Sequence, residues 1–137
     1  MKTKKQKENP WQYIDNARQT LKTKAIKHGE FYTYPKYVKT AGHQAWTGVL
    51  LALDELMKYK GVFIKGRKDI DDYRNFVSKQ NRKILDYLNS AYNYLHLLMG
   101  YDGDLDTNTA KRGLELAENI IHWVEKQLPE NYFNQEN

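Results

Sequence analysis

Four stretches of this chain place apolar side chains at three- and four-residue spacing, and this periodicity constrains the fold more than any other feature. The stretches cover roughly residues 10–29, 35–59, 78–99 and 107–128. Apolar residues at this spacing lie on one face of a helix, and several such helices bury their faces most simply against one another. No stretch shows convincing strand alternation. The sequence therefore predicts an all-α fold, an up-and-down bundle of four main helices plus one short helix.

Helix boundaries in the first half follow from residues that start or stop helices. Asn9 is a good N-cap and Pro10 suits the first helical position, so the first helix begins there and ends near Gly29. Pro35 opens a second helix that runs to about Tyr59. The second helix carries two adjacent apolar stripes, which indicates contact with more than one neighbour and a central position.

The second half of the chain contains the short helix and the two remaining long ones. Helical periodicity resumes at Asp69, and Ser78 is a candidate N-cap, so we expect a short helix, a break near Ser78 and a long helix to about Met99. Residues 100–106 have the composition of a turn, and Asp106 or Thr107 is expected to cap the last helix.

Two glycines, Gly42 and Gly48, interrupt the second helix, although glycine in a helix interior costs about 1 kcal/mol relative to alanine. This cost is offset where the missing side chain lets another helix come close. We therefore expect a close helix approach beside Trp46.

The length of 137 residues suits one domain. We expect a flexible basic tail over residues 1–8, a single helical-bundle domain over residues 9–129 and a flexible tail over residues 130–137. The net charge is +5, and the four lysines of the first seven residues together with Glu8 contribute +3 of it. Because much of the positive charge lies in the tail, the basic pI is weak evidence for nucleic-acid binding.

Residue patterns of secreted, membrane-spanning or cofactor-dependent proteins are missing from the sequence. It contains no cysteine, no N-terminal apolar run typical of a signal peptide and no run of about 18 apolar residues. We therefore expect a cytoplasmic protein without membrane contact. We also expect no cofactor and no metal, because the sequence contains no motif for either.

Two runs resemble an uncharacterised bacterial family known only as a domain of unknown function. They are YVKTAGHQAWTGVLLALDELMKYKG, residues 37–61, and SKQNRKILDYLNSAYNYLHLLMGYDG, residues 78–103. The resemblance covers about residues 12–125. Its motifs are structural in character, so the resemblance implies a fold and not an activity.

A more distant resemblance connects the run AGHQAWTGVLLALDEL, residues 41–56, with the second helix of HEPN domains. Many HEPN domains cleave RNA with an arginine followed after four to six residues by a histidine. No pair in this chain has that spacing, and Arg112 and His122 are ten residues apart. The resemblance therefore implies nucleotide or RNA binding, or dimerisation, without the nuclease chemistry.

Polar and aromatic side chains of the helical stretches 35–59 and 78–99 form a candidate ligand site. His43 lies beside Gln44 and near Thr47, and in a bundle His96 can converge with His43. Such a pair suits a general base or a ligand contact. The alternative is a half-buried His43 bonded to a neighbouring helix and a His96 on a solvated face. No Glu-x-x-His pair supports a metal site.

Tyrosines extend this candidate site. Tyr87, Tyr94 and Tyr101 recur every seven residues, which places them along one side of a regular helix. Their rings either stack on a ligand or pack at the edge of the core with their hydroxyls in water. The ligand-binding residues that we predict are His43, Trp46, Tyr87, Tyr94, His96 and Tyr101.

The linker between the second and third helices contains the cluster of basic residues that lies within the folded domain. Lys65, Arg67 and Lys68 lie near Phe63, and they either bind phosphate or form a solvated loop. No nucleophile or carboxylate pair stands out, so we assign no catalytic residue. The sequence thus favours a non-enzymatic interaction module that self-associates, as a dimer for example, or docks a partner. The alternative is a HEPN-like bundle that binds a nucleotide or RNA.

Overall fold

The structure is a computed structural model that describes residues 8–134, and it confirms the predicted all-α bundle. Five α-helices form the body, and two of them continue into wider π-helical segments. Its helical elements are α1 (Pro10–Thr20) with η1 (Leu21–Ala25), α2 (Pro35–Tyr59), α3 (Ile70–Ser78), α4 (Arg82–Ala91) with η2 (Tyr92–Tyr101), α5 (Thr107–Gln127) and the 3₁₀-helix η3 (Tyr132–Asn134).

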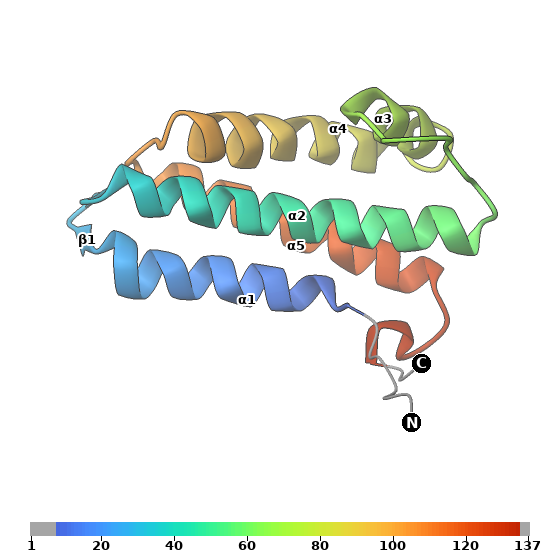
Figure 1. The fold of residues 1–137 in the computed structure, drawn as a ribbon, viewed down its shortest axis with the longest axis horizontal. Coiled ribbons are helices and arrows are strands. Elements are labelled where there is room, and N and C mark those ends of the chain that lie inside the picture. Colours follow the sequence, from blue (N-terminus) through green and yellow to red (C-terminus); the bar gives the residue numbers. More distant parts are fainter. Residues whose placement is uncertain (1–7, 135–137) are drawn as a thin grey trace.

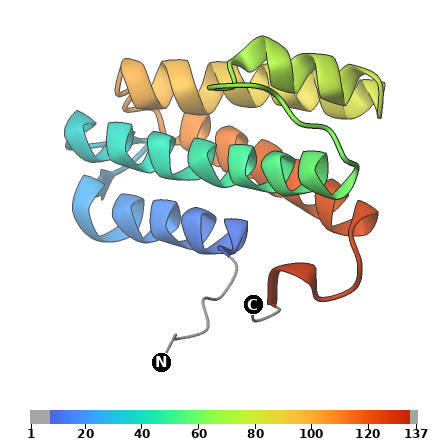
Figure 2. The same cartoon turned by 45° about the vertical axis from the view of Figure 1, so that its right-hand side comes forward.

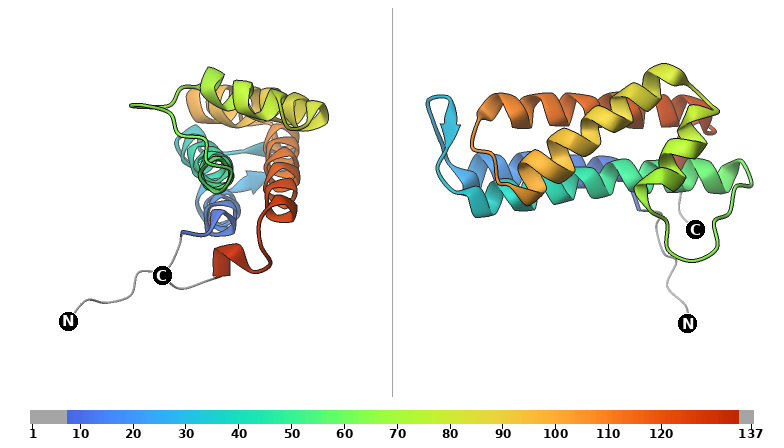
Figure 3. Two further views of the ribbon diagram at one scale, coloured as in Figure 1. Left: turned by 90° about the vertical axis from the view of Figure 1, so that its right-hand side faces the viewer. Right: turned by 90° about the horizontal axis from the view of Figure 1, so that it is seen from above.

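Helix α2 occupies the centre of the bundle, as its two apolar stripes predict. It packs against α1, η2 and α5, and the end-on view shows these neighbours around it (Figure 3). Successive long helices run in opposite directions (Figure 1). The core between them contains fully buried side chains such as Ile14, Leu53 and Leu116. Within residues 8–134, no helix is long and apolar enough to cross a bilayer.

A short β-hairpin connects α1 to α2, which the sequence analysis did not predict. Strands β1 (Lys27–His28) and β2 (Phe31–Tyr32) are antiparallel, and Gly29 takes a φ of +61° in the turn. Two residues per strand are too few to show alternation, which is the physical reason for the error. The first helical segment accordingly ends at Ala25, a few residues before Gly29.

The expected break between the third and fourth helices is confirmed, but its capping residue is different. Helix α3 ends at Ser78, whose hydroxyl donates to the Asn75 carbonyl at 2.8 Å. Asn81 caps α4 instead, because its side-chain oxygen accepts from the Ile84 amide at 3.1 Å. Asp106 caps α5, one of the two expected residues.

The long helix formed by α4 and η2 extends further than predicted, because η2 continues to Tyr101. Gly100 is therefore helical and not the first residue of a turn. The segment is unusual in length, since π-helices mostly occur as single turns. Its i→i+5 hydrogen bonds change which side chains share a face, and this affects the candidate site.

The C-terminal segment packs against the bundle beyond residue 129, where we placed the domain end. Helix η3 turns back toward the start of α1 (Figure 2), where Asn9 Nδ2 donates to Asn134 Oδ1 at 3.4 Å. Phe133 is buried, and the Tyr132 hydroxyl donates to Glu55 Oε1 at 3.0 Å. Residues 1–7 and 135–137 of the two predicted tails lie outside the described residues.

Candidate functional site

Two of the predicted ligand-binding residues, Trp46 of α2 and His96 of η2, line a cleft of about 180 Å³. The cleft lies where the α2–α3 linker rejoins the body, so it combines side chains from three parts of the chain. Its lining residues are Trp46 and Leu50 of α2, Lys68, Asp69, Ile70 and Tyr73 of the linker and α3, and Tyr92 and His96 of η2.

His96 occupies the centre of a cluster of rings. Its imidazole centroid lies 5.1 Å from the ring of Tyr92 and 6.0 Å from that of Trp46. His43 approaches from α2 with a centroid distance of 6.2 Å, so the two histidines converge. The exposed ring of Tyr101 completes the cluster at 6.3 Å from His96.

Glycines allow α2 and η2 to approach this closely. A Cβ atom on Gly42 would lie 2.6 Å from the Leu95 carbonyl oxygen, and one on Gly100 would lie 3.0 Å from His43 Cε1. Gly48 allows α1 to approach α2 on the other side, because a Cβ atom on Gly48 would lie 3.0 Å from the Pro10 carbonyl oxygen of α1. The expected close approach beside Trp46 therefore occurs on two sides of α2.

The surroundings of His96 favour a neutral imidazole. Burial lowers the pKa of His96 below its ordinary value, and the nearby His43 lowers it further. Its Nδ1 atom is buried and has no hydrogen-bond partner within residues 8–134. Among residues 8–134, the other titratable groups at the cluster and its cleft are Tyr73, Tyr92, Tyr101, Lys68 and Asp69. Protonating His96 would bury a charge beside a second histidine.

Acidification is expected to destabilise the protein through His96. Because the pKa of His96 is lower in the folded state, the unfolded state takes up the proton first as the pH falls below about 6.5. Stability is then lost toward acidic pH, whereas above about pH 7 the residue has no effect. Urea unfolding at several pH values should show a larger acid loss for the wild type than for His96→Gln. Superimposable pH profiles would contradict this assignment.

The tyrosines do not form the single stripe that a regular helix predicts. Tyr101 contacts His96, whereas Tyr94 lies against α5, with its Cβ 3.4 Å from the position of a Cβ on Gly113. Tyr87 lies under the Lys83 amine, 5.7 Å from its ring centroid. The seven-residue spacing corresponds to two α-helical turns but not to the wider π-helical turns of η2.

Sequence reasoning missed several residues of the cleft, chiefly Tyr73 and Tyr92. The Arg74 guanidinium lies 5.2 Å from the centroid of Tyr92. Tyr73 donates its hydroxyl to Asp54 Oδ1 at 2.8 Å, and burial together with this bond raises the pKa of Tyr73. The four-residue spacing of Tyr92 and His96 indicates a shared helix face, but both Tyr73 and Tyr92 acquire their role through the packing of α3 and η2 beside α2.

The three predicted phosphate-binding residues separate into two groups. Lys68 lies at the edge of the cleft, where its Nζ atom is 3.3 Å from Asp54 Oδ1. Lys65 and Arg67 are exposed, and neither forms an ion pair with a residue of the described chain. The structure therefore leaves two of these cations available to a ligand.

Three consecutive apolar residues of the linker, Val62, Phe63 and Ile64, form what we call the apolar tip. Phe63 is 78% exposed, and its two neighbours are exposed by 36% and 37%. The linker stands away from the helices in the end-on view (Figure 3). The apolar tip thus exposes aliphatic and aromatic surface directly beside Lys65.

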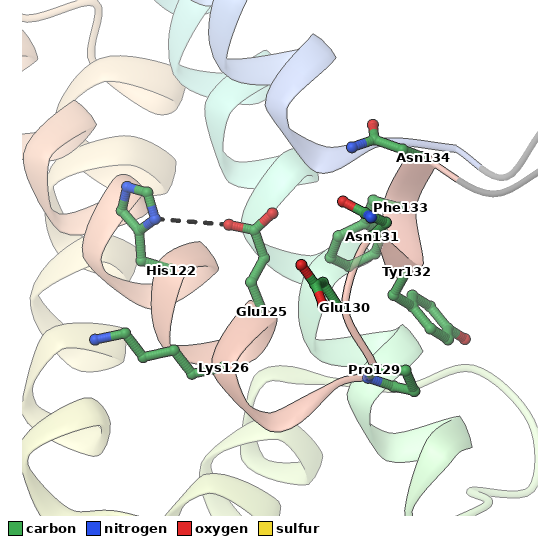
Figure 4. A pocket seen from close by; sticks show the side chains of 9 residues that line it. All are labelled: His122, Glu125, Lys126, Pro129, Glu130, Asn131, Tyr132, Phe133 and Asn134. Atoms are coloured by element: carbon green, nitrogen blue, oxygen red, sulfur yellow. Dashed lines mark ion pairs between the residues drawn. The ribbon is translucent and has the colours of Figure 1, made fainter.

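A second hollow, of about 280 Å³, lies where η3 folds back on α5 (Figure 4). His122 and Glu125 face each other there at 3.6 Å, and Tyr132 points away from the hollow. The ring of His122 also packs against that of Trp11 in a tilted arrangement, with 4.7 Å between the ring centroids. Its lining carries charged groups of both signs and His122 is already engaged, so we assign no ligand to this hollow.

Fold and site together define a small helical bundle with an aromatic cleft and, among residues 8–134, no group of three His, Asp or Glu residues placed to hold a metal. The chain belongs to the family described as Domain of unknown function (DUF5618), which matches residues 5–126. It is similar to the structure of a protein of unknown function from Dyadobacter fermentans, with 45% identity and a TM-score of 0.82. The match covers 88% of this chain and 94% of that chain. No curated protein matches this chain.

Proposed function

We propose that this protein is a non-enzymatic binding module that docks a partner protein through the apolar tip and the adjoining cleft. The observation that carries the proposal is the exposure of three consecutive apolar side chains, with Phe63 at 78%. Burying a phenylalanine side chain stabilises a complex by about 1.5–3 kcal/mol, so a partner that covers this tip gains affinity from it.

Charges around the apolar tip support a partner with an acidic rim. Lys60, Lys65 and Arg67 surround the tip, and the linker between Lys60 and Asp69 contains no acidic residue. A symmetric dimer through this tip would bring the cations of both copies together, because a two-fold interface pairs the same patch with itself. Charge complementarity therefore favours an apolar pocket edged by carboxylates over a second copy of this chain.

The cleft supplies a second contact for the same partner segment. It lies where the linker ends, with Lys68 and Asp69 at its edge. Its volume of about 180 Å³ suits one side chain rather than a complete cofactor. An extended segment that covers the apolar tip can therefore place one apolar side chain in the mouth of this cleft, beside Ile70.

A HEPN-like nucleotide- or RNA-binding role is the second candidate, and the exposed pair Lys65 and Arg67 favours it. Base stacking at the cleft has less support, because Trp46 is only 7% exposed. The ring of Tyr92 already contacts Arg74 and His96. Phe63 is the one aromatic ring of the linker, and sequence-independent binding of single strands uses several stacked bases.

A peptide selection with the full chain tests the proposed function. We expect phage-displayed random peptides enriched on the wild type to combine an aromatic or large aliphatic residue with two or more acidic residues. Fluorescence polarisation of the synthetic peptides should then show about 10- to 100-fold weaker binding to Phe63→Ser, as expected for a lost aromatic anchor. Lys65→Glu/Arg67→Glu should weaken binding about tenfold or more and reduce its salt dependence.

Phe31→Ser is the matched control, because Phe31 is also exposed, at 57%, but lies in the hairpin at the other end of the bundle (Figure 1). It should leave peptide affinity unchanged. Equal binding by Phe63→Ser, or no enrichment of any peptide, would overturn the proposal. A single-stranded RNA that binds with a steep salt dependence would favour the second candidate. A dimer that Phe63→Ser dissolves in sedimentation equilibrium would favour self-association instead.

A further inference from the structure

A third hollow, of about 310 Å³, lies at the hairpin end of the bundle and belongs to neither the cleft nor the apolar tip. It opens between the end of α1, the hairpin and the first turns of α5. The residues that line it are Arg18, Leu21, Lys22, Lys27, Tyr32 and Leu114.

The charges of this hollow are positive. Arg18, Lys22 and Lys27 line it, and no carboxylate of residues 8–134 does. Arg18 is bonded to Glu118 at 2.8 Å, with Asp15 at 3.9 Å. Within residues 8–134, neither Lys22 nor Lys27 forms an ion pair. The hollow therefore contains two unpaired lysine amines beside the Arg18 guanidinium, which is paired with Glu118.

The floor of the hollow is apolar. Leu21 and Leu114 are each less than 10% exposed and present part of their side chains to it. Tyr32 is half-buried, and burial raises its pKa, so its phenol is neutral and can donate a hydrogen bond. An apolar floor under a cationic rim matches a molecule that has both an anionic group and an apolar body.

Strained backbone borders the hollow between its two lysines. Ile26 has a φ of +55°, a conformation that is a clear outlier for a β-branched residue. The carbonyl of Ile26 accepts from the Thr33 amide and from the Thr33 hydroxyl, both at 2.8 Å, and these bonds hold the strained residue. Such strain persists only where its surroundings enforce it, and it concentrates at binding sites. Here it turns the chain from η1 into the hairpin and places Lys22 and Lys27 on the same hollow.

We infer that this hollow binds a small organic anion with an apolar body, of the aromatic carboxylate class. The carboxylate lies against Lys22 and Lys27, and the ring lies on Leu21 and Leu114. Arg18 is paired with Glu118 at 2.8 Å, so the two lysines supply the positive charge that the anion meets. This inference is independent of the proposed partner docking, because the two sites share no residue.

Protein-observed NMR of the full chain tests this inference with three probes: 2-naphthoate, its uncharged analogue 2-naphthamide, and inorganic phosphate. We expect 2-naphthoate to shift the amide signals of the lining residues in a saturable manner. Both other probes should bind at least about tenfold more weakly, because 2-naphthamide lacks the negative charge and phosphate lacks the apolar body. Lys22→Glu/Lys27→Glu should also weaken 2-naphthoate binding at least about tenfold.

Lys79→Glu/Lys83→Glu is the matched control, with the same change in net charge at the α3–α4 junction, at the opposite end of the bundle (Figure 1). It should change the 2-naphthoate affinity less than about twofold. All replaced lysines are exposed, so circular dichroism should show both double variants folded. The inference is overturned if 2-naphthoate gives no saturable shifts, shifts other residues, binds no better than 2-naphthamide or phosphate, or binds Lys22→Glu/Lys27→Glu equally well.

Discussion

Replacing Gly42 by alanine is expected to lower the free energy of unfolding by about 3 kcal/mol, at the upper end of the usual cost of overpacking a core. The new Cβ would lie 2.6 Å from the Leu95 carbonyl oxygen and 2.7 Å from the Gly100 nitrogen and from Met99 Cβ. None of these atoms is the end of a flexible side chain. The helices must therefore move apart, which outweighs the gain of about 1 kcal/mol in helix propensity.

Two other glycines provide graded controls for Gly42→Ala. A Cβ on Gly48 would lie 3.0 Å from the Pro10 carbonyl oxygen and 3.1 Å from Tyr13 Cβ, so Gly48→Ala should cost less than about 1 kcal/mol. A Cβ on Gly113 would meet Leu95 Cδ2 at 2.7 Å, a side-chain end that can shift. Urea unfolding of the three variants should rank Gly42→Ala as the least stable. A Gly42→Ala protein as stable as the wild type would contradict the close α2–η2 approach.

Truncating Leu95 to alanine is expected to cost about 4 kcal/mol. Leu95 is fully buried in η2, and its side chain occupies the space that Gly113 leaves open on α5. The truncation removes apolar contacts and leaves a cavity between helices that glycines already hold close together. Because the backbone atoms around it are tightly packed, the site collapses little and the cavity cost stays large.

Leu98→Ala is the matched control for Leu95→Ala, because Leu98 belongs to the same π-helical segment but is half-buried. It should cost about 1.5 kcal/mol, in proportion to the smaller apolar area that it removes from water. Thermal and urea unfolding should agree on this order. Equal losses of unfolding free energy for the two variants would show that the Leu95 side chain of η2 is not packed in the core.

The two proposed sites lie at different ends of the bundle and are separable by mutation. Phe63→Ser should weaken peptide binding about 10- to 100-fold and leave 2-naphthoate binding unchanged. The double variant Lys22→Glu/Lys27→Glu should weaken 2-naphthoate binding and leave peptide binding unchanged. Because the apolar tip and the hairpin hollow share no residue, failure of one proposal leaves the other standing.

Much of the fold was predictable because it depends on local rules. The start of α1 at Pro10, the extent of α2, the break after α3 and the Asp106 cap all follow from capping chemistry and apolar periodicity. The hairpin was not predictable, since its two-residue strands are held by contacts distant in sequence. One of them joins the Tyr32 amide to the Leu105 carbonyl at 2.8 Å.

The candidate site was predictable only in part. The convergence of His43 and His96 follows from placing two antiparallel helices side by side. The positions of Tyr94 and Tyr101 could not be predicted in this way, because the seven-residue spacing assumes an α-helix and η2 is π-helical. The engagement of Lys68 by Asp54 likewise depends on how the linker returns to the body.

Residue order alone thus determined the helical class, the number of long helices, the caps of α1 and α5 and the central position of α2, because each depends on side chains that are neighbours along the chain. Tertiary structure decided the π-helical register of η2, the hairpin, the cleft and the exposure of the apolar tip. The physical reason is that these features arise from contacts between segments far apart in sequence. Such contacts select one backbone geometry among several that local preferences allow equally well.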